Sequence, residues 1–461
     1  MSKKSERPKV YVLDTSALIH DPRTVNRLGD NTVIIPISVL SELDKLKVKD
    51  GNLGFNAREA IAVVEKLTGN GFSPGDIAHG VRTNAGGRLL FDLKDSSWTQ
   101  VPDGLERKND TRILIAAKNA HDKFPGSEVI ILSQDVNLRV ISRSCGIKAE
   151  DYRNDRMVED VDNLYSGRVV ATLPPEQAGY LQTLYHERRL PVKAISCFLP
   201  ERELYPNECV ELVAGDNYAV GVHEKGFVRV IPMGKTGEKE VNCPVSLRTP
   251  EQYMGYHLVQ KSRLELNTLV GKTGSGKTFL ALMAAYIQTR TDDAKRIMVF
   301  RPHVELGPEF GILPGDINEK FAPWARPVRE NMLKIISLVN NVSRDQAGIS
   351  LTELIRNGYL EINPISHIRG CTFDDAVIVI DEGQNLTPHE MRSTITRAGE
   401  GTRIMITGDP TQIDNRFLDS RNNGLVFVTE RFKDDDEFGH LTYFKSVRSR
   451  LAEKAARRLA A

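Results

Sequence analysis

One eight-residue segment constrains this chain more than any other part of its sequence. It reads Gly271-Lys272-Thr273-Gly274-Ser275-Gly276-Lys277-Thr278 and fits the pattern G-x-x-x-x-G-K-[ST]. An apolar run at 268–270 precedes it, and a helix-forming stretch at 279–286 follows. Glycines let backbone amides close around phosphate groups, and a helix N-terminus adds the positive end of its dipole. The alternative is a glycine-rich turn that happens to precede Lys-Thr, but such a turn does not require this context. The sequence therefore predicts a nucleotide-binding strand, loop and helix.

Two side chains of this loop have distinct expected roles. Lys277 would neutralise the β- and γ-phosphates, and the hydroxyl of Thr278 would ligate Mg²⁺. All eight residues of the loop are candidate nucleotide ligands.

Two further signals favour nucleotide hydrolysis over binding alone. The apolar run 377–380 leads into Asp381 and Glu382. A carboxylate at the end of a neighbouring strand would hold the Mg²⁺, and Glu382 would then orient or activate the attacking water. A solvated acidic turn is the alternative. The run 403–406 is followed by a polar turn that contains Gln412, where a sensor of the γ-phosphate would lie, although Asp-Pro is also an ordinary turn.

These residues carry a resemblance to a known family. Asp-Glu-x-Gln after one strand and Gly-Asp-x-x-Gln after the next resemble the core of superfamily 1 helicases, and the PhoH-like ATPase family resembles the chain more closely over residues 245–450. The further stretches that carry this resemblance are Arg301-Pro302, Gly311 to Asp316, Glu319-Lys320, Pro323-Trp324, Ile368 to Gly370, Gln384 to Glu390, Thr396 to Gly399 and Gln412 to Asn415. Gly383 and Cys371 depart from the family pattern, but neither replaces a charge or a metal ligand. Gln252 resembles a glutamine that reads adenine, which implies ATP as the nucleotide, although Pro-Glu-Gln is also a normal helix start.

Four acids stand at informative places in the first third of the chain. Asp14 and Asp135 follow apolar strands, Glu42 lies in the helix after the second strand, and Asp110 begins a helix. In a parallel sheet, strand ends and helix starts open on one edge, where ligands bind. Four acids gathered there would repel one another unless cations lay between them, and hard oxygen ligands suit Mg²⁺ or Mn²⁺. Such ions could activate water for attack on a phosphodiester, with hydroxyl contacts from Ser16 and Ser133. The alternative is helix caps and solvated acids, and Asp110 taken alone is better explained as a cap.

The short sequence segments around these acids resemble those of the PIN-domain nucleases, and the order of the segments along the chain matches as well. They are the stretches 13–19, 41–47, 109–114 and 133–139. The resemblance implies a metal-dependent ribonuclease centred on Asp14, Glu42, Asp110 and Asp135, with RNA as the partner. A PIN domain ahead of a PhoH-like ATPase is a known arrangement, so each resemblance supports the other.

The chain of 461 residues divides by its patterning into three parts. Continuous apolar strands that alternate with helices predict an α/β fold with parallel sheets in residues 1–155 and 245–461. The resemblances imply that the first is a PIN-like nuclease domain and that the second is a P-loop domain of the RecA or superfamily 1 helicase type. Residues 156–244 carry short strand-like runs punctuated by Gly, Asn and Asp, as in antiparallel hairpins, and predict a connector with a small β-rich module.

Composition and charge exclude several classes of protein and indicate the cellular compartment. The 62 basic and 61 acidic residues nearly cancel, which excludes a global polyanion-binding charge but not local basic patches. The five cysteines are scattered, which argues against a disulfide framework or a zinc site and for a reducing cytoplasm. The apolar runs are far too short to span a membrane, and the polar start of the chain has no signal-peptide core, so we expect no membrane association.

The end of the chain is basic, with six basic residues and one acid from 441 onward. One interpretation is a solvated helix with charges at helical spacing. The more specific interpretation is that Arg448 acts as an arginine finger or as a γ-phosphate sensor. Because only one ATPase core is present, whereas superfamily 1 enzymes use two, we expect the arginine to come from a neighbouring subunit of a ring, a hexamer in the first instance.

The combined hypothesis is ATP-driven remodelling or unwinding of RNA, coupled to RNA cleavage by the PIN-like domain. One alternative is a nuclease that is gated by the nucleotide state without translocation. Another is an ATPase whose PIN-like half only binds RNA, but clustered acids do not favour binding of a polyanion.

Overall fold

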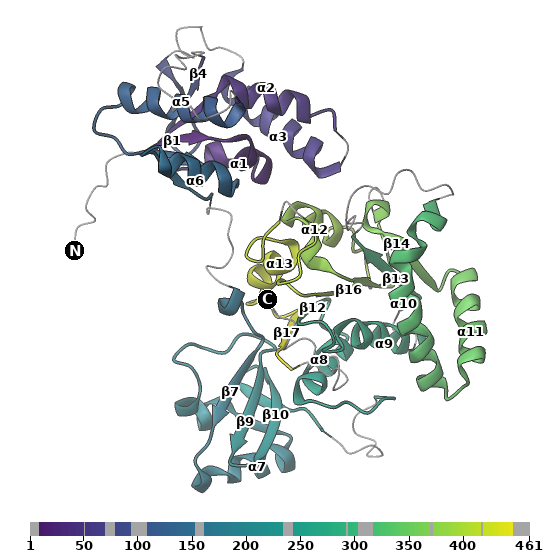
Figure 1. Ribbon diagram of the computed structural model, residues 1–461. Coiled ribbons are helices and arrows are strands. Elements are labelled where there is room, and N and C mark those ends of the chain that lie inside the picture. The colour runs from purple at the N-terminus through teal and green to yellow at the C-terminus, as the bar shows by residue number, and fades with distance from the viewer. Residues whose placement is uncertain are drawn as a thin grey trace. The chain divides into compact units, whose positions relative to one another are not determined.

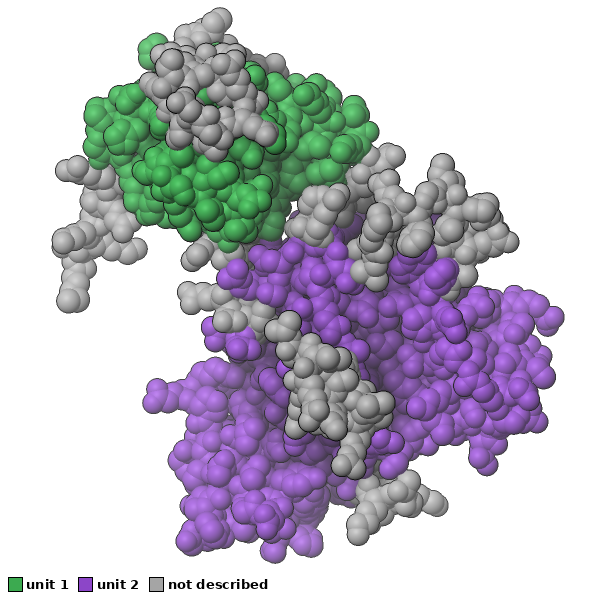
Figure 2. Space-filling view, viewed as in Figure 1, with its two compact units in different colours: residues 1–156 green, residues 157–461 purple. Residues whose placement is uncertain are grey.

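The computed structural model describes residues 9–49, 51–69, 79–93, 108–152, 161–233, 243–291, 294–302, 317–368, 372–415 and 418–445. The chain forms two compact units, residues 1–156 and residues 157–461 (Figures 1 and 2). In the described part of the chain, no helix is both long and apolar enough to cross a bilayer.

The first unit is built on a six-stranded sheet with the strand order β3-β4-β2-β1-β5-β6. Every pairing is parallel except that of β3 with β4. The strands are β1 (Val10–Leu13), β2 (Thr32–Pro36), β3 (Val81–Arg82), β4 (Arg88–Asp92), β5 (Val129–Leu132) and β6 (Lys148–Glu150). The helices are α1 (Thr15–His20), α2 (Ile37–Leu46), α3 (Gly51–Thr68), α5 (Asn109–Lys123) and α6 (Val136–Ser144).

The central strands of this sheet are apolar along their whole length because helices cover both faces. All four residues of β5 are buried, and so are three of the four in β1. β1 lies between β2 and β5, so the carboxyl ends of three strands open on the same edge. This arrangement confirms the predicted parallel sheet and places the residues after β1 and β5 side by side.

The second unit begins with the β-rich module, a five-stranded sheet ordered β7-β9-β10-β11-β8. Its elements are β7 (Arg168–Thr172), α7 (Gly179–Glu187), β8 (Arg189–Pro191), β9 (Cys209–Ala214), β10 (Asn217–Glu224) and β11 (Phe227–Val230). The expected antiparallel pairing holds for β8 to β11, but β7 runs parallel to β9. The segment between these two strands contains α7 and is long enough to return the chain to the same end of the sheet.

The larger part of the second unit is a six-stranded parallel sheet ordered β14-β13-β15-β16-β12-β17. The strands are β12 (Leu266–Gly271), β13 (Arg296–Arg301), β14 (Leu360–Pro364), β15 (Ala376–Ile380), β16 (Arg403–Gly408) and β17 (Phe438–Tyr443). The helices are α8 (Pro250–Gln260), α9 (Lys277–Arg290), α10 (Ile317–Asn340), α11 (Arg344–Arg356), α12 (Pro388–Ile395) and α13 (Gly424–Phe432).

Alternate residues of these strands pack into two separate cores. Ile297 and Val299 of β13 belong to the core under α8, α9, α10 and α11, whereas Met298 and Phe300 belong to the core under α12 and α13. Figure 1 shows α9 and α10 on one face of this sheet and α12 and α13 on the other. Because the faces are sealed by helices, the ligand site of such a sheet lies at the carboxyl ends of its strands.

Candidate functional sites

The predicted phosphate loop connects β12 to α9. Gly276 is the N-cap of α9 and has a φ of 96°, a left-handed conformation that glycine adopts without strain. Lys277 is buried, and its ammonium donates to the backbone carbonyls of Gly271 and Lys272. The hydroxyl of Ser275 is also buried and has no hydrogen-bond partner. The lysine of the loop thus bonds to the loop's own carbonyls, and the serine hydroxyl is buried without an acceptor. A bound phosphate group would supply acceptors to both side chains, so the loop fits such a ligand.

The predicted magnesium acid lies next to this loop. Oδ1 of Asp381 accepts hydrogen bonds from the hydroxyls of Thr278 and Thr407, each at 2.7 Å. The expectation that β15 is the immediate neighbour of the loop strand is wrong, because β16 lies between β15 and β12. Thr407 of that intervening strand bridges the gap. The oxygen donors of Thr278 and Asp381 are the kind that Mg²⁺ prefers, so these residues fit that ion.

Glu382 has a backbone conformation that is unusual for a residue with a side chain. Its φ is 61° and its ψ is 41°, in the left-handed region. Such outliers cost free energy and cluster at functional sites. Its carboxylate accepts a 2.7 Å hydrogen bond from Nε2 of Gln384. Burial, followed by repulsion from the adjacent Asp381, raises the pKa of Glu382. A carboxyl group with a raised pKa is better matched to accepting a proton from water.

Gln412 touches the phosphate loop. Its Oε1 accepts a 2.6 Å hydrogen bond from the hydroxyl of Thr273, and its backbone carbonyl accepts a 3.0 Å bond from Nε2 of Gln384. Gln384 therefore joins the segment after β15 to the segment after β16. This position is consistent with the predicted sensor, although the role itself stays a prediction.

Gln252 lies in the first turn of α8 and is buried. Its Oε1 accepts from the backbone N–H of Arg248 at 2.8 Å, and its Nε2 donates to the carbonyl of Ser275 at 3.0 Å. The side chain thus braces the phosphate loop, and the reading of adenine remains a prediction.

Arg301 is a site residue that the sequence argument missed. It ends β13, and its Nε lies 3.1 Å from Oδ2 of Asp381. The rule that strand ends line the site would have marked Arg301 as a candidate, but only the register of the sheet shows which acids it contacts. Arg448, by contrast, lies outside the described residues, as do Cys371 and the family stretch 311–316.

The acids of the first unit are held by hydroxyl and amide groups. Asp14 is buried, and its Oδ2 accepts from the hydroxyls of Ser16 and, at 2.6 Å, Ser133. Burial raises the pKa of Asp14, while these hydrogen bonds lower it. The two serines were expected to add hydroxyl contacts at this site, and their hydroxyls orient Asp14.

Glu42 is oriented from two other elements. Its Oε2 accepts from the hydroxyl of Thr15 at 2.7 Å and from Nδ2 of Asn109 at 3.2 Å. Thr15 directly follows Asp14, and Asn109 directly precedes Asp110. The hydrogen bonds of Glu42 therefore draw three of the four acid-bearing segments together.

The other two acids differ in role. Asp135 is the N-cap of α6 and accepts from the backbone N–H of Asn137 at 2.7 Å. Asp110 is not a cap: the N-cap of α5 is Lys108, without a side-chain capping bond, so the cap alternative for Asp110 is wrong. Burial and the charges of Asp14, Asp135 and Glu42 raise the pKa of Asp110. A divalent cation would relieve this repulsion, so the donor set fits one.

The four acids are near one another but do not form a ready ligand cage. In the part of the chain that the structure describes, no group of three or more His, Cys, Asp or Glu residues is arranged to hold a metal ion. The four-ligand site therefore stays a prediction that requires the carboxylates to move inward when an ion binds.

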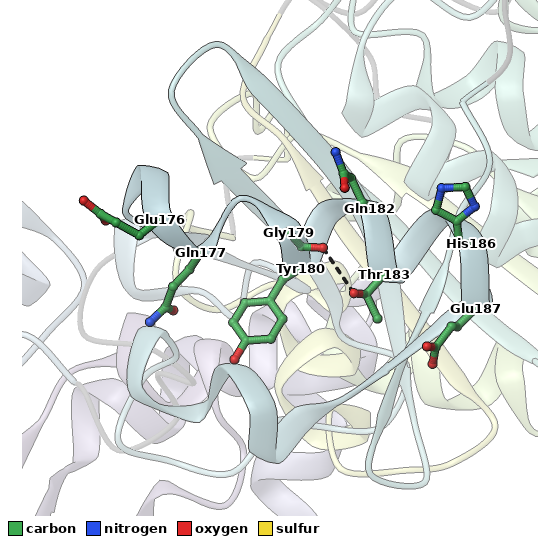
Figure 3. A pocket seen from close by; sticks show the side chains of 8 residues that line it. All are labelled: Glu176, Gln177, Gly179, Tyr180, Gln182, Thr183, His186 and Glu187. Carbon is green, nitrogen blue, oxygen red and sulfur yellow. Dashed lines mark hydrogen bonds between the residues drawn. The ribbon is translucent and has the colours of Figure 1, made fainter.

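One surface hollow of the second unit is lined by residues that belong to neither candidate site. It has a volume of about 610 Å³ and follows α7, where Tyr180 and Thr183 line it and the hydroxyl of Thr183 donates to the carbonyl of Gly179 (Figure 3). No site residue predicted from the sequence lines this hollow.

Comparisons with known proteins agree with both halves of this description. A PIN domain model matches residues 11–153, and the model of PhoH-like proteins matches residues 244–459. Protein PhoH2 of Bacillus subtilis is 34% identical over 97% of this chain and 99% of its own length. Protein PhoH2 of Mycolicibacterium smegmatis is 30% identical over 96% of this chain and 95% of its own length. Protein PhoH of Escherichia coli is 32% identical, but covers 50% of this chain and 62% of its own length.

Together these matches confirm the family resemblance and support enzyme activity of the ATPase and nuclease-like types. Because the match to the PhoH2 proteins extends over nearly the whole chain, this protein belongs to the PhoH2 family, in which a PIN domain precedes a PhoH-like ATPase domain.

Proposed function

We propose that this chain uses ATP hydrolysis in its second unit to remodel or unwind RNA, and that it couples this work to metal-dependent RNA cleavage in its PIN domain. The observation that carries the proposal is the convergence of Thr278 and Thr407 on Asp381, with Glu382 beside it. It joins the phosphate loop, the magnesium acid and the candidate base in one arrangement.

For ATP hydrolysis, Lys277 and the loop amides would bind the phosphates, and Thr278 and Asp381 would hold Mg²⁺. The ion supplies charge compensation at the transferred phosphoryl group. Glu382 would accept the proton of the attacking water, since its pKa is raised. Gln384, which holds both Glu382 and the Gln412 segment, would report the state of the γ-phosphate to the base.

For RNA cleavage, Asp14, Glu42, Asp110 and Asp135 would hold Mg²⁺ or Mn²⁺, and the ion would activate water for attack on the phosphodiester. RNA is proposed as the substrate because the PIN resemblance implies it. Further parts of the proposal are a cytoplasmic location and self-association as a ring, in which Arg448 would act on the ATP of a neighbouring subunit.

A second mechanism uses the same residues without translocation. ATP binding would open or close the nuclease, and hydrolysis would only reset it. The hydrogen bonds from Glu382 through Gln384 and Gln412 to Thr273 of the phosphate loop support this alternative, because a bound nucleotide would have a route from the loop to the base.

RNA cleavage assays separate the two mechanisms. The substrates are a single strand and the same strand within a hairpin, each tested with and without Mg²⁺, with ATP and with a non-hydrolysable analogue. Remodelling predicts that the hairpin is cut only with ATP, while the single strand is cut in every reaction that contains Mg²⁺. Gating predicts that the analogue alters cleavage of both substrates. Absence of cleavage of either substrate under all conditions would contradict the nuclease proposal.

A further inference from the structure

Arg301 reaches both acids of the ATPase site from the strand next to them. Its Nε lies 3.1 Å from Oδ2 of Asp381, and its Nη2 lies 3.6 Å from Oε1 of Glu382. Its remaining terminal nitrogen, Nη1, donates a 2.6 Å hydrogen bond to the backbone carbonyl of Trp324 in α10. The three nitrogens of the guanidinium therefore face three different acceptors, and the side chain of Arg301 is 14% exposed.

The register of the sheet explains this position. Phe300 of β13 pairs with Ile380 of β15, so the residues that follow them emerge side by side. The backbone N–H of Asp381 donates to the carbonyl of Phe300, which fixes the start of both turns. Thr407 meets Asp381 from β16, the strand on the other side of β15, and Arg301 meets it from β13.

Two adjacent carboxylates at a buried strand end need a cation. The side chain of Asp381 is 5% exposed, and Glu382 directly follows it in the chain. Lys277 directs its ammonium to two loop carbonyls. Arg301 makes an ion pair with each of the two acids, and the charge of Lys277 also acts on Glu382. A planar fork with fixed donors suits this task, because it can meet two carboxylates at once.

We propose that Arg301 is a positioning residue for ATP hydrolysis, acting as the internal counter-ion of Asp381 and Glu382. It holds both carboxylates in place before Mg²⁺ and ATP arrive, and its bond to Trp324 fixes the guanidinium itself. This inference rests on the proposed roles of Asp381 and Glu382. The sequence patterns did not assign Arg301 any role.

The proposal has a consequence in the absence of nucleotide. Without Arg301, the buried Asp381 and the partly exposed Glu382 beside it lose their shared ion-pair partner, which destabilises the folded state. A divalent cation alone would then restore the missing charge. Arg301→Gln should therefore melt below wild type in chelator and regain a large part of the loss when Mg²⁺ is added without nucleotide. In wild type the two acids of this site are already compensated, so its response to Mg²⁺ should be smaller than that of Arg301→Gln, while the acids of the first unit contribute equally in both proteins.

The matched control is Arg296→Gln. Arg296 begins the same strand, and its Nη1 lies 4.0 Å from Glu361, away from the site. Its loss should leave the response to Mg²⁺ as in wild type. Arg301→Lys keeps the charge but not the fork. It should melt close to wild type in chelator yet hydrolyse ATP slowly, because one ammonium cannot hold two carboxylates and Trp324 together.

Steady-state ATP hydrolysis by the full chain supplies the second measurement. Arg301→Gln should lower kcat by roughly a hundredfold, the usual cost of a misplaced catalytic group, with little change in KM. If Arg301 only stabilised the fold, its substitution would lower the melting temperature without this selective loss of kcat.

Several results would overturn the inference. They are an Mg²⁺ response of Arg301→Gln equal to that of wild type, a kcat near wild type, or an Arg301→Lys protein that melts as low as Arg301→Gln in chelator. Failure of the ATPase assignment itself would look different, because wild type and Lys277→Ala would then hydrolyse ATP at the same rate.

Discussion

The hydroxyl of Thr407 donates a 2.7 Å hydrogen bond to Oδ1 of Asp381, and both residues are buried. This contact ties the end of β15 to β16, the strand that separates it from the phosphate loop. The same oxygen accepts from Thr278 of the loop at 2.7 Å. Asp381 is therefore held from β16 and from the phosphate loop, so its carboxylate is oriented before any ligand binds.

Thr407→Val should slow ATP hydrolysis while the fold is kept, because valine has the shape of threonine but cannot donate to Asp381. A hydrogen bond to a charged group contributes about 1.5–3 kcal/mol, which corresponds to a loss of roughly tenfold to a hundredfold in kcat. Thr407→Ser, which restores the hydroxyl, is the control. Equal kcat for the valine variant and wild type would show that the contact does not matter for turnover.

Glu382→Gln should bind ATP with Mg²⁺ but turn it over slowly, because Asp381 keeps the metal and the base is lost. The loss of a general base costs roughly a hundredfold or more in rate. Affinity can be measured with a fluorescent ATP analogue and turnover by phosphate release. A variant that fails to bind ATP would mean that the division of labour between the two acids is wrong.

Asp14→Asn should abolish RNA cleavage and spare ATP hydrolysis, because the substitution removes one formal charge from the proposed metal site of the first unit. Glu187→Gln, at the surface hollow along α7, is a control that also removes one acid. Metal-dependent cleavage retained by Asp14→Asn would eliminate the four-acid assignment.

The same substitution makes a prediction about stability against pH. Burial raises the pKa of Asp14 above its ordinary value of 3.8, so the folded state prefers the protonated carboxyl. The contribution of Asp14 is therefore most favourable below pH 3.8 and is lost as the pH rises through the raised pKa. In chelator, Asp14→Asn should melt above wild type at neutral pH, and the gap should narrow as the pH falls. Melting curves in which the gap widens toward acid pH would contradict this sign.

Gly383→Ala should destabilise the second unit, although alanine favours helical backbone. A Cβ atom at Gly383 would lie 2.6 Å from Cγ2 of Ile406 and 3.3 Å from Cε of Met391. Overpacking of this kind costs about 1–3 kcal/mol. Ile406→Ala removes the crowding atom, so the two substitutions together should cost less than the sum of their separate effects. Additive losses in denaturant unfolding would show that Ile406 is not the obstacle.

The strands that carry the site could be predicted because they are apolar along their length. Val377 to Ile380 and Val129 to Leu132 are buried along their whole length. A short apolar run between predicted helices in an alternating α/β pattern indicates a buried parallel strand. The edge strand β17 was missed because His440 and Thr442 interrupt its apolar pattern. In the structure, Nδ1 of His440 is 2.6 Å from the hydroxyl of Thr268 in β12, so a polar residue is accommodated inside the sheet.

Site residues could be predicted from the sequence where the residue type and its motif together indicate a single chemical role. The loop 271–278 and Asp381 belong to this class. Arg301 does not, because an arginine after a strand is ordinary until the register shows which acids lie beside it. Likewise, a serine such as Ser133 shows its role only once the fold brings it to Asp14, 119 residues earlier in the chain.

Arg448→Ala should lower ATP turnover far more than ATP affinity, if Arg448 acts on the γ-phosphate of a neighbouring subunit. An arginine of this kind stabilises charge that develops only in the transition state, so its loss appears in kcat. The expected loss is roughly a thousandfold, as for arginine fingers in general. Turnover close to wild type would favour the other interpretation of the basic tail, in which it is a solvated helix.

A mixing experiment then distinguishes action between subunits from action within one. Arg448→Ala subunits have an intact phosphate loop, and Lys277→Ala subunits have an intact arginine. In a ring that contains both, some interfaces pair the intact loop with the intact arginine, so mixed assemblies should regain part of the activity that neither variant has alone. Such rescue requires a closed arrangement with head-to-tail interfaces. Complete absence of rescue in assemblies shown by mass to be mixed would place Arg448 in its own subunit's site, and a strictly monomeric wild type would remove the ring from the proposal.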